Sequence, residues 1–218
     1  MDQLFVTADG SHSIISETFE VAYHSKHGAI QESQHVFIDA GLHQFPKDND
    51  ISILEVGFGT GLNALLTAVE SEQRTGRIEY YAMEAYPVAS ELLSQLNYTD
   101  NIPNSTDLFD KIHKGDWGKT LKVTDRFSIL KKQMDFLHLE ESDKFDLIYF
   151  DAFAPNSQPE LWTTEALGIF VNSLKSGGIL TTYCAKGVVR RNFESLGCGS
   201  ERIPGPQGKR EMLRITKH

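Results

Sequence analysis

The sequence predicts an α/β fold built around a mostly parallel sheet, and three observations lead to this prediction. From residue 51 onward, short apolar runs alternate with amphipathic segments, as expected for βαβ units. The first of these apolar runs ends in a glycine-rich turn. Two closely spaced strand-like segments near the C-terminus predict an antiparallel pair that closes the sheet.

Residues 1–50 precede this pattern and are predicted to form a small N-terminal extension of short strands and a helix. Strand-forming residues are concentrated in three segments, at 4–7, 13–16 and 20–25. Residues 28–42 carry apolar side chains at helical spacing, at Ile30, Val36, Phe37 and Leu42. The segment FPKDND at 45–50 then breaks the chain.

Residues 51–218 are predicted to form the main domain. Its parallel strands are expected at residues 51–57, 78–85, 126–133, 145–151 and 179–185. Helices are expected at residues 62–73, 88–97, 164–175 and 188–197, and the antiparallel pair at 200–205 and 210–216. Five parallel strands followed by such a pair are typical of a Rossmann-like methyltransferase sheet, whereas a dehydrogenase more often continues with parallel units.

Composition restricts the class of protein. The chain has 218 residues, of which 40% are hydrophobic, enough for one sizeable core. No apolar run approaches the roughly 20 residues that span a bilayer, and no basic stretch followed by an apolar one begins the chain, so we expect a soluble, cytoplasmic protein. Cys184 and Cys198 are too few for a disulfide framework and have no metal-ligand spacing, so we expect ordinary thiols and no metal.

The formal net charge of −9 argues against a nucleic-acid partner, but the charges are unevenly distributed. Residues 111–132 hold seven Lys or Arg against two acids, and residues 186–218 hold eight against three. These two segments can give an acidic protein a basic face. The alternative, that the basic residues are scattered over a solvated surface, stays open.

The glycine-rich turn after the first parallel strand indicates a cofactor site. It reads LEVGFGTGLNALL, and glycines there let a ligand approach bare backbone at a helix N-terminus. A dinucleotide fingerprint has its third glycine three residues after the second, where this chain has Leu62, so that fingerprint fails. Glu55, Gly57, Gly59 and Gly61 have the spacing found in S-adenosylmethionine enzymes, with a carboxylate near the methionine end of the ligand. A plain glycine-rich turn is the alternative.

Two further acids are placed to bind the adenosine part of such a cofactor. Glu84 ends the second parallel strand, 27 residues after Gly57, where it can accept hydrogen bonds from both ribose hydroxyls. Asp135 follows the third strand and can accept from the adenine amino group, beside the apolar Met134 and Phe136. The alternatives are a solvated loop residue for Glu84 and a helix N-cap for Asp135.

Asp151 is the predicted catalytic residue. It ends the fourth strand in FDLIYFDAFAPNSQPELW, and ligands of open α/β sheets bind beyond the carboxyl ends of strands where the strand order reverses. An ionised carboxylate there can hold an amine by its N–H groups and direct its lone pair at a sulfonium methyl group. Phe153 and Pro155 would exclude water and shape a slot for a planar base. The alternative is that Asp151 caps the next segment.

Several segments together resemble the methyltransferase domain of the MnmC family, the tRNA 5-methylaminomethyl-2-thiouridine biosynthesis proteins. They are VAYHSKHGAIQESQHVFI, LEVGFGTGLNALL, YYAMEAYPV, FDLIYFDAFAPNSQPELWT and GKREMLRI, which extend from about residue 20 to the C-terminus. The resemblance implies a Rossmann-like class I fold that uses S-adenosylmethionine to N-methylate the 5-aminomethyl group of the wobble (2-thio)uridine in the tRNA anticodon stem-loop. It also implies that Asp151 takes the acidic position of the active site, with the cofactor beside Glu55, Gly57, Gly59, Gly61 and Glu84.

Two features depart from the family pattern. The family has a basic residue and an Asn before the second proline of the DAFAP block, whereas this chain has Ser157 and Gln158. The FAD-dependent oxidase domain of bifunctional members is absent from this sequence. We therefore expect a stand-alone methyltransferase whose aminomethyl-uridine substrate is supplied by another enzyme.

A tRNA would be held by its phosphates, which the two basic segments can contact. We expect binding by Arg190, Arg191, Lys209 and Arg210, of which the last two lie in the family block GKREML. These residues are predicted to lie on the cleft side of the sheet, on one face with some of Lys111, Lys114, Lys119 and Lys122.

Other functions fit parts of the same pattern. A spermidine synthase-like aminopropyltransferase has a similar fold, an acidic strand end and an amine nucleophile, but it would carry a second acid three residues after the first, where this chain has Ala154. A methyltransferase acting on a small amine is a related alternative. A non-catalytic binding module is a third, although intact Glu55, Glu84 and Asp151 argue against it.

Overall fold

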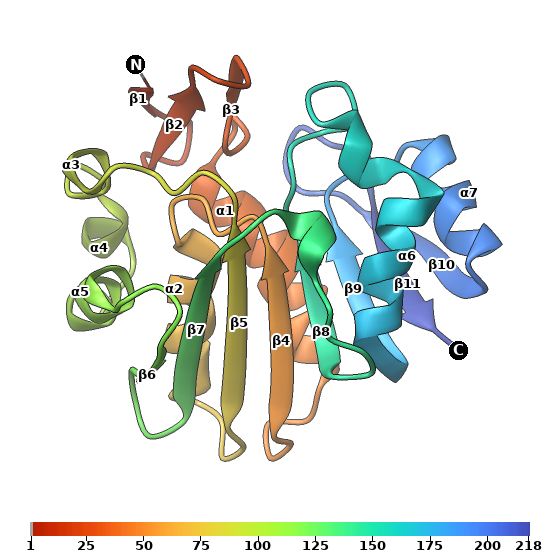
Figure 1. Ribbon diagram of the computed structural model, residues 1–218. Helices are drawn as coiled ribbons and strands as arrows, with labels where there is room; N and C mark the ends of the chain where they lie inside the picture. Colours follow the sequence, from red (N-terminus) through yellow and green to blue (C-terminus); the bar gives the residue numbers. More distant parts are fainter. Residues whose placement is uncertain (1) are drawn as a thin grey trace.

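The computed structural model describes residues 2–218, which form two sheets and the helices around them (Figure 1). Strands β1 (Gln3–Val6), β2 (His12–Ser16) and β3 (Val21–Ala22) make a small antiparallel sheet. The predicted strand at 20–25 is thus only two residues long. The predicted helix at 28–42 is divided into α1 (Ala29–Ser33), the π-helical η1 (Gln34–Asp39) and the 3-10 turn η2 (Leu42–Gln44).

The larger sheet has eight strands in the order β10-β11-β9-β8-β4-β5-β7-β6. The predicted parallel strands are confirmed as β4 (Ile51–Val56), β5 (Ile78–Glu84), β7 (Phe127–Gln133), β8 (Phe145–Phe150) and β9 (Leu174–Thr182). The predicted antiparallel pair is confirmed as β10 (Cys198–Pro204) and β11 (Glu211–Lys217), with β11 beside β9. The short β6 (Thr120–Lys122) pairs antiparallel with β7 at the other edge and was not predicted.

The parallel strands separate two apolar cores because successive side chains of a strand point to opposite faces. Ile53 and Tyr80 belong to the core under η1, α2 (Leu62–Ser71) and α5 (Thr106–Lys114). Leu54 and Tyr81 belong to the core under α6 (Thr164–Ser173) and α7 (Gly187–Ser195). The sheet is therefore covered on both faces, and the ends of its strands are left to form a site.

Three helical segments differ from the predictions. The helix expected at 88–97 is reduced to α3 (Ser90–Leu93), which buries no side chain and so lacks the packing that extends helices, and is followed by α4 (Tyr98–Asn101). Helix α5 was missed, although it buries three apolar side chains on one face. Strand β9 begins at Leu174, within the predicted helix 164–175, because that residue pairs with Phe145 of β8.

Some features bear on the class of protein. Within residues 2–218, no helix is both long enough and apolar enough to cross a membrane. Cys184 and Cys198 are buried and unbonded. The described residues contain no cluster of three or more His, Cys, Asp or Glu side chains suited to a metal ion.

Candidate functional site

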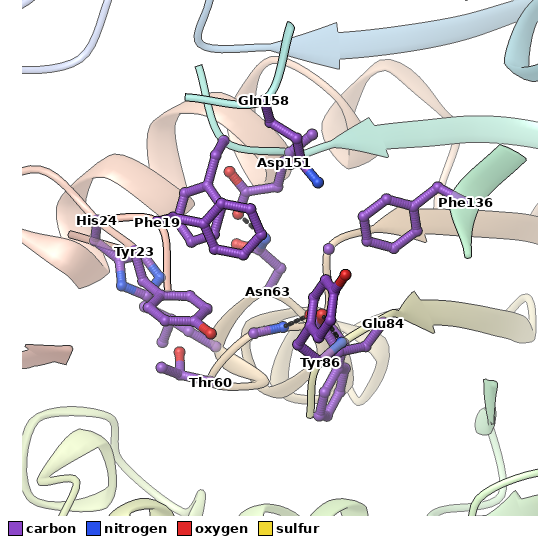
Figure 2. Close-up of a pocket in the computed structure, with 16 residues that line it drawn as sticks. Phe19, Tyr23, His24, Thr60, Asn63, Glu84, Tyr86, Phe136, Asp151 and Gln158 are labelled. Atoms are coloured by element: carbon purple, nitrogen blue, oxygen red, sulfur yellow. Dashed lines mark hydrogen bonds between the residues drawn. The ribbon is translucent and has the colours of Figure 1, made fainter. Parts of the chain in front are cut away.

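A cavity of about 550 Å³, including its open mouth, lies at the carboxyl ends of β4, β5 and β8 (Figure 2). Strand β4 lies between β5 and β8, where the strand order reverses, so this is the crevice in which open α/β sheets bind ligands. The residues that line it are Phe19, Tyr23, His24, Gly57, Phe58, Gly59, Thr60, Leu62, Asn63, Glu84, Tyr86, Phe136, Asp151, Ala152, Phe153 and Gln158.

The glycine turn forms the floor of the cavity and requires glycine for its shape. Gly57 and Gly59 have φ angles of 93° and 50°, which other residues rarely adopt. A Cβ atom on Gly57 would lie 2.8 Å from the Asp151 carbonyl oxygen, and one on Gly59 would lie 2.9 Å from the Tyr23 ring. The third predicted glycine, Gly61, precedes α2 and does not line the cavity. The first two therefore expose backbone to a ligand.

Glu84 lies at one end of the cavity and is only 7% exposed. Its Oε2 accepts a hydrogen bond from the Gly59 N–H at 2.9 Å, and its Oε1 accepts one from the Tyr86 N–H at 2.9 Å. Burial raises the pKa of Glu84, and these backbone donors partly offset that rise. Each oxygen keeps a free lone pair, so this oriented carboxylate can accept from ligand hydroxyls.

Asp151 lies directly after β8 and forms another part of the wall. Its backbone N–H donates to the Val56 carbonyl at 3.0 Å, and its Oδ2 accepts from Asn63 Nδ2 at 2.8 Å. Burial raises the pKa of Asp151 well above its ordinary value, and the Asn63 amide partly counters this. Such a carboxylate has a strong preference for a cation or a proton donor.

Glu55 does not line the cavity, and its predicted place near the methionine end of the ligand stays a prediction. Strand alternation places its side chain on the same face as Ile53, where it is completely buried. Neither carboxylate oxygen meets the geometry of a hydrogen bond, although Tyr80 and Asn63 lie close enough to favour the ionised form and partly lower the pKa. Burial, followed by the nearby charge of Asp151, raises the pKa of Glu55 well above its ordinary value. It is therefore a buried acid behind the cavity wall.

Asp135 is a helix N-cap, which was the alternative to its predicted contact with adenine. Its side chain accepts from the Leu137 N–H at 2.9 Å and caps the short 3-10 helix η3 (Phe136–His138). The Asp135 side chain is exposed and does not line the cavity, whereas Phe136 does. A contact from Asp135 to an adenine stays a prediction.

The N-terminal extension closes part of the cavity with aromatic rings, which the sequence analysis missed. Phe153 lies against Phe19 and Tyr23, with ring centroids 4.7 and 5.1 Å apart. Phe19 also approaches Tyr86 at 5.9 Å. Pro155 does not line the cavity. The similarity of the segment beginning VAYHSK to a methyltransferase family was the available signal for this contribution.

The cavity has an acidic character. Its lining includes Glu84 and Asp151 but no Lys or Arg among the described residues. Burial lowers the pKa of His24 to about 4, so this lining residue is neutral at pH 7. A cationic ligand such as a sulfonium or an ammonium group therefore suits this surface.

The two basic segments do not form the single face that was predicted. Residues 111–132 supply the end of α5, β6 and β7, whereas residues 186–218 supply α7, β10 and β11 (Figure 1). The strand order puts β6 and β10 at opposite edges of the sheet. Helices α5 and α7 also belong to cores on opposite faces. The prediction of one shared basic face is therefore wrong.

None of the four predicted tRNA-binding residues lines the cavity. Lys209 donates to Glu32 at 2.6 Å and lies 3.9 Å from the centre of the Tyr183 ring, so it holds the β10–β11 turn against α1. Arg190 pairs with Glu194 within α7. Arg191 and Arg210 have exposed side chains that make no ion pair with the described residues.

Comparison with known proteins gives consistent matches. Residues 97–218 match the family model described as S-adenosyl-L-methionine-dependent methyltransferase. The chain is 30% identical to the tRNA 5-methylaminomethyl-2-thiouridine biosynthesis bifunctional protein MnmC of Leptospira borgpetersenii, over 91% of this chain and 32% of that protein. It is also 30% identical to the protein of the same name from Aromatoleum aromaticum, over 97% of this chain and 35% of that protein.

The chain thus spans about a third of the length of these curated relatives. A solved structure, MnmC2 from Aquifex aeolicus, superposes with a TM-score of 0.84 at 24% identity. That match covers 100% of this chain and 70% of the other. At this identity the match shows a shared fold.

Proposed function

Because the chain belongs to the family of S-adenosyl-L-methionine-dependent methyltransferases, we propose that it N-methylates the 5-aminomethyl group of the wobble (2-thio)uridine in tRNA. One observation carries the proposal: the Asp151 carboxylate, oriented by Asn63, lies in the same cavity as the Glu84 carboxylate, oriented by the glycine turn. The names of the relatives, which are tRNA 5-methylaminomethyl-2-thiouridine biosynthesis proteins, support this substrate class.

The residues present fit the cofactor. S-adenosylmethionine supplies an electrophilic methyl group on a sulfonium. Gly57 and Gly59 would let the cofactor approach the backbone, because no side chain fits there. Glu84 would accept hydrogen bonds from the ribose hydroxyls, for which its oxygens are already oriented. The acidic lining favours the positive charge of the sulfonium.

Asp151 would hold and deprotonate the amine. A primary amine is protonated at neutral pH and attacks only after losing a proton, and an Asp with a raised pKa is a better proton acceptor than an ordinary one. The deprotonated amine could then accept the methyl group that the cofactor supplies, and the proton would stay on the carboxyl group or pass to water. The Asn63 amide keeps the carboxylate oriented throughout.

The alternatives are less well supported. An aminopropyltransferase would use a second acid where this chain has Ala154, and the family model describes a methyltransferase. The proposed substrate must already carry a free 5-aminomethyl group, so a separate reaction has to supply it. A tRNA substrate would place the protein in the cytoplasm.

Mass analysis of wobble nucleosides tests the proposal. The protein is incubated with S-adenosylmethionine and tRNA that contains 5-aminomethyl-2-thiouridine, and the digest is examined for the methylaminomethyl product. We expect product with the wild type and at least about 10²-fold slower formation with Asp151→Ala. If the wild type binds the cofactor but transfers no methyl group to this tRNA, the proposed substrate is wrong.

A further inference from the structure

Gln158 is a buried polar residue that the proposed chemistry does not use. It is 6% exposed and lines the cavity, yet its side-chain amide makes no hydrogen bond with any described residue. Buried side-chain amides are nearly always hydrogen-bonded. The amide atoms open onto the cavity, so a ligand bound there can take the place of water as their hydrogen-bond partner.

The backbone around Gln158 is held by hydrogen bonds, so its side chain leaves the turn at a fixed point. The Gln158 N–H donates to the Ala154 carbonyl at 3.0 Å, and Pro159 begins the 3-10 helix η4 (Pro159–Trp162). The Trp162 indole donates to the Phe153 carbonyl at 2.8 Å and is almost completely buried. A fixed starting point for the side chain lowers the cost of ordering it on a ligand, which is useful in a recognition residue.

The position of Gln158 indicates which part of the ligand it contacts. It belongs to the turn that begins at Asp151, and Figure 2 shows both side chains on the side of the cavity away from Glu84 and Tyr86. If Glu84 binds the ribose of the cofactor, Gln158 faces the molecule that accepts the methyl group. Its amide can both donate and accept a hydrogen bond.

We propose that Gln158 is a specificity-determining residue that reads the base edge of the nucleoside whose amine is held by Asp151. This inference rests on the proposed function. In a 5-aminomethyluracil the C4 carbonyl is adjacent to the carbon that carries the amine arm, and N3–H follows. The Gln158 amide would donate to the C4 carbonyl and can accept from N3–H.

The substitution Gln158→Glu tests this reading because it keeps the shape and removes the donor. A carboxylate only accepts, so it should disfavour the C4 carbonyl of uracil and favour the C4 amino group of cytosine. The measurement is kcat/KM on two anticodon stem-loop RNAs, one with 5-aminomethyluridine and one with 5-aminomethylcytidine at the wobble position. We expect the uridine-to-cytidine ratio to fall at least tenfold. The added negative charge near Asp151 affects both RNAs, so it does not change the ratio.

Two further variants complete the experiment. Gln158→Ala should lower kcat/KM for the uridine RNA about tenfold while calorimetry shows unchanged S-adenosylmethionine affinity. Ser157→Ala, the matched control in the same turn, should leave both quantities unchanged, since Ser157 does not line the cavity. Thermal unfolding verifies that all variants are folded.

The outcomes separate this inference from the proposed function. A wild-type protein that binds S-adenosylmethionine but methylates neither RNA overturns the proposed function. An active wild type whose uridine-to-cytidine ratio is unchanged by Gln158→Glu overturns only the role of Gln158. The same conclusion follows if kcat/KM for Gln158→Ala stays within about twofold of the wild type, or if cofactor affinity falls in parallel with activity.

Discussion

Asp151 combines a position in the cavity wall with an electrostatic penalty. Its carboxylate is held by one amide donor in a cavity whose other ionisable carboxylate, Glu84, is also partly desolvated. Active sites commonly retain such groups although they lower stability, because the chemistry needs them. Glu55, behind the cavity wall, carries a similar burial penalty, although the proposed chemistry does not use it.

Replacing Asp151 should therefore affect activity and stability in opposite directions. Asp151→Asn can still accept from Asn63, but it cannot take a proton from an amine, so kcat should fall roughly 10²-fold or more. Cofactor affinity should change much less. Single-turnover methyl transfer and calorimetry measure the two effects, and near-wild-type turnover would refute the catalytic role.

The stability effect of Asp151→Asn should depend on pH. The pKa of Asp151 is raised in the folded protein, so folded molecules bind more protons than unfolded ones as pH rises above the ordinary value of 3.8. The wild type thus loses stability between 3.8 and the raised pKa, whereas the Asn variant does not. In urea unfolding, the free energy of unfolding of the variant should rise relative to that of the wild type as the pH increases through this window. Below the window the two free energies should not differ. An equal difference at every pH would contradict this explanation.

Glu84 should be the main residue for cofactor affinity. Loss of charge-assisted hydrogen bonds to two ribose hydroxyls predicts that Glu84→Ala weakens S-adenosylmethionine binding by about 1.5–3 kcal/mol or more. Glu79→Ala is the matched control, since Glu79 is exposed on the same strand near its other end. Calorimetry measures the S-adenosylmethionine affinity of both variants. An unchanged affinity of the Glu84 variant would exclude Glu84 from the site.

At the scale of elements, the sequence was most informative where packing and periodicity agree. The parallel strands were predictable because they are short apolar runs buried on both faces, as Leu147 and Ile148 of β8 are. The positions of Asp151 and Glu84 at the cavity were predictable because Asp151 directly follows such a strand and Glu84 ends one. The lengths of helix α3 and strand β9 were not predictable from the sequence. The length of α3 depends on tertiary burial, and the start of β9 depends on pairing with Phe145.

Contacts between distant elements were the least predictable part of the site. Nothing local in the sequence indicates that Phe19 reaches Phe153, or that Lys209 reaches Glu32. The direction of the Glu55 side chain was also not evident from the motif spacing, because strand alternation decides which face it takes. The lysine in the GKREML block looked like a phosphate ligand, whereas the structure shows it joining the β10–β11 turn to α1.

This contact predicts that Lys209 mainly supports the structure. Lys209→Ala would leave the Glu32 carboxylate, whose side chain is 9% exposed, without its cation, so unfolding should become easier by about 1–2 kcal/mol. Adding Glu32→Gln should recover part of that loss because no unpaired charge then remains. Urea midpoints of the two single variants and the double variant measure the coupling. Additive effects would show that the ion pair contributes nothing.

On the scale of the whole molecule, the charge distribution restricts how an acidic protein could bind the proposed tRNA substrate. The net charge is −9, so a polyanion is repelled at long range and must be held by a local group of cations. Many basic side chains are already paired, as Lys119 is with Asp116 and Lys122 with Asp125. The exposed cations without an acidic partner in the described chain include Arg191 and Arg210.

The position of these two arginines favours them as phosphate ligands. The Arg191 guanidinium comes within 3.2 Å of the Cβ position of Gly187 at the start of α7, just beyond the carboxyl end of β9. Arg210 lies in the β10–β11 turn, which packs against His27 of the N-terminal extension. Both therefore lie toward the end of the sheet that holds the cavity.

Replacing Arg191 and Arg210 together by Ala should thus raise the KM for tRNA and make the slope of log K against log salt shallower by about one to two units. Affinity for S-adenosylmethionine should not change, because neither side chain lines the cavity. The matched control replaces Lys119 and Lys122, which lie just before and at the end of β6 at the opposite edge of the sheet, and should leave the slope unchanged. Equal effects of the two double variants would mean that tRNA is attracted without a local binding face. If neither double variant alters tRNA binding at any salt concentration, the phosphates are not held by these arginines, and a small amine becomes the better substrate.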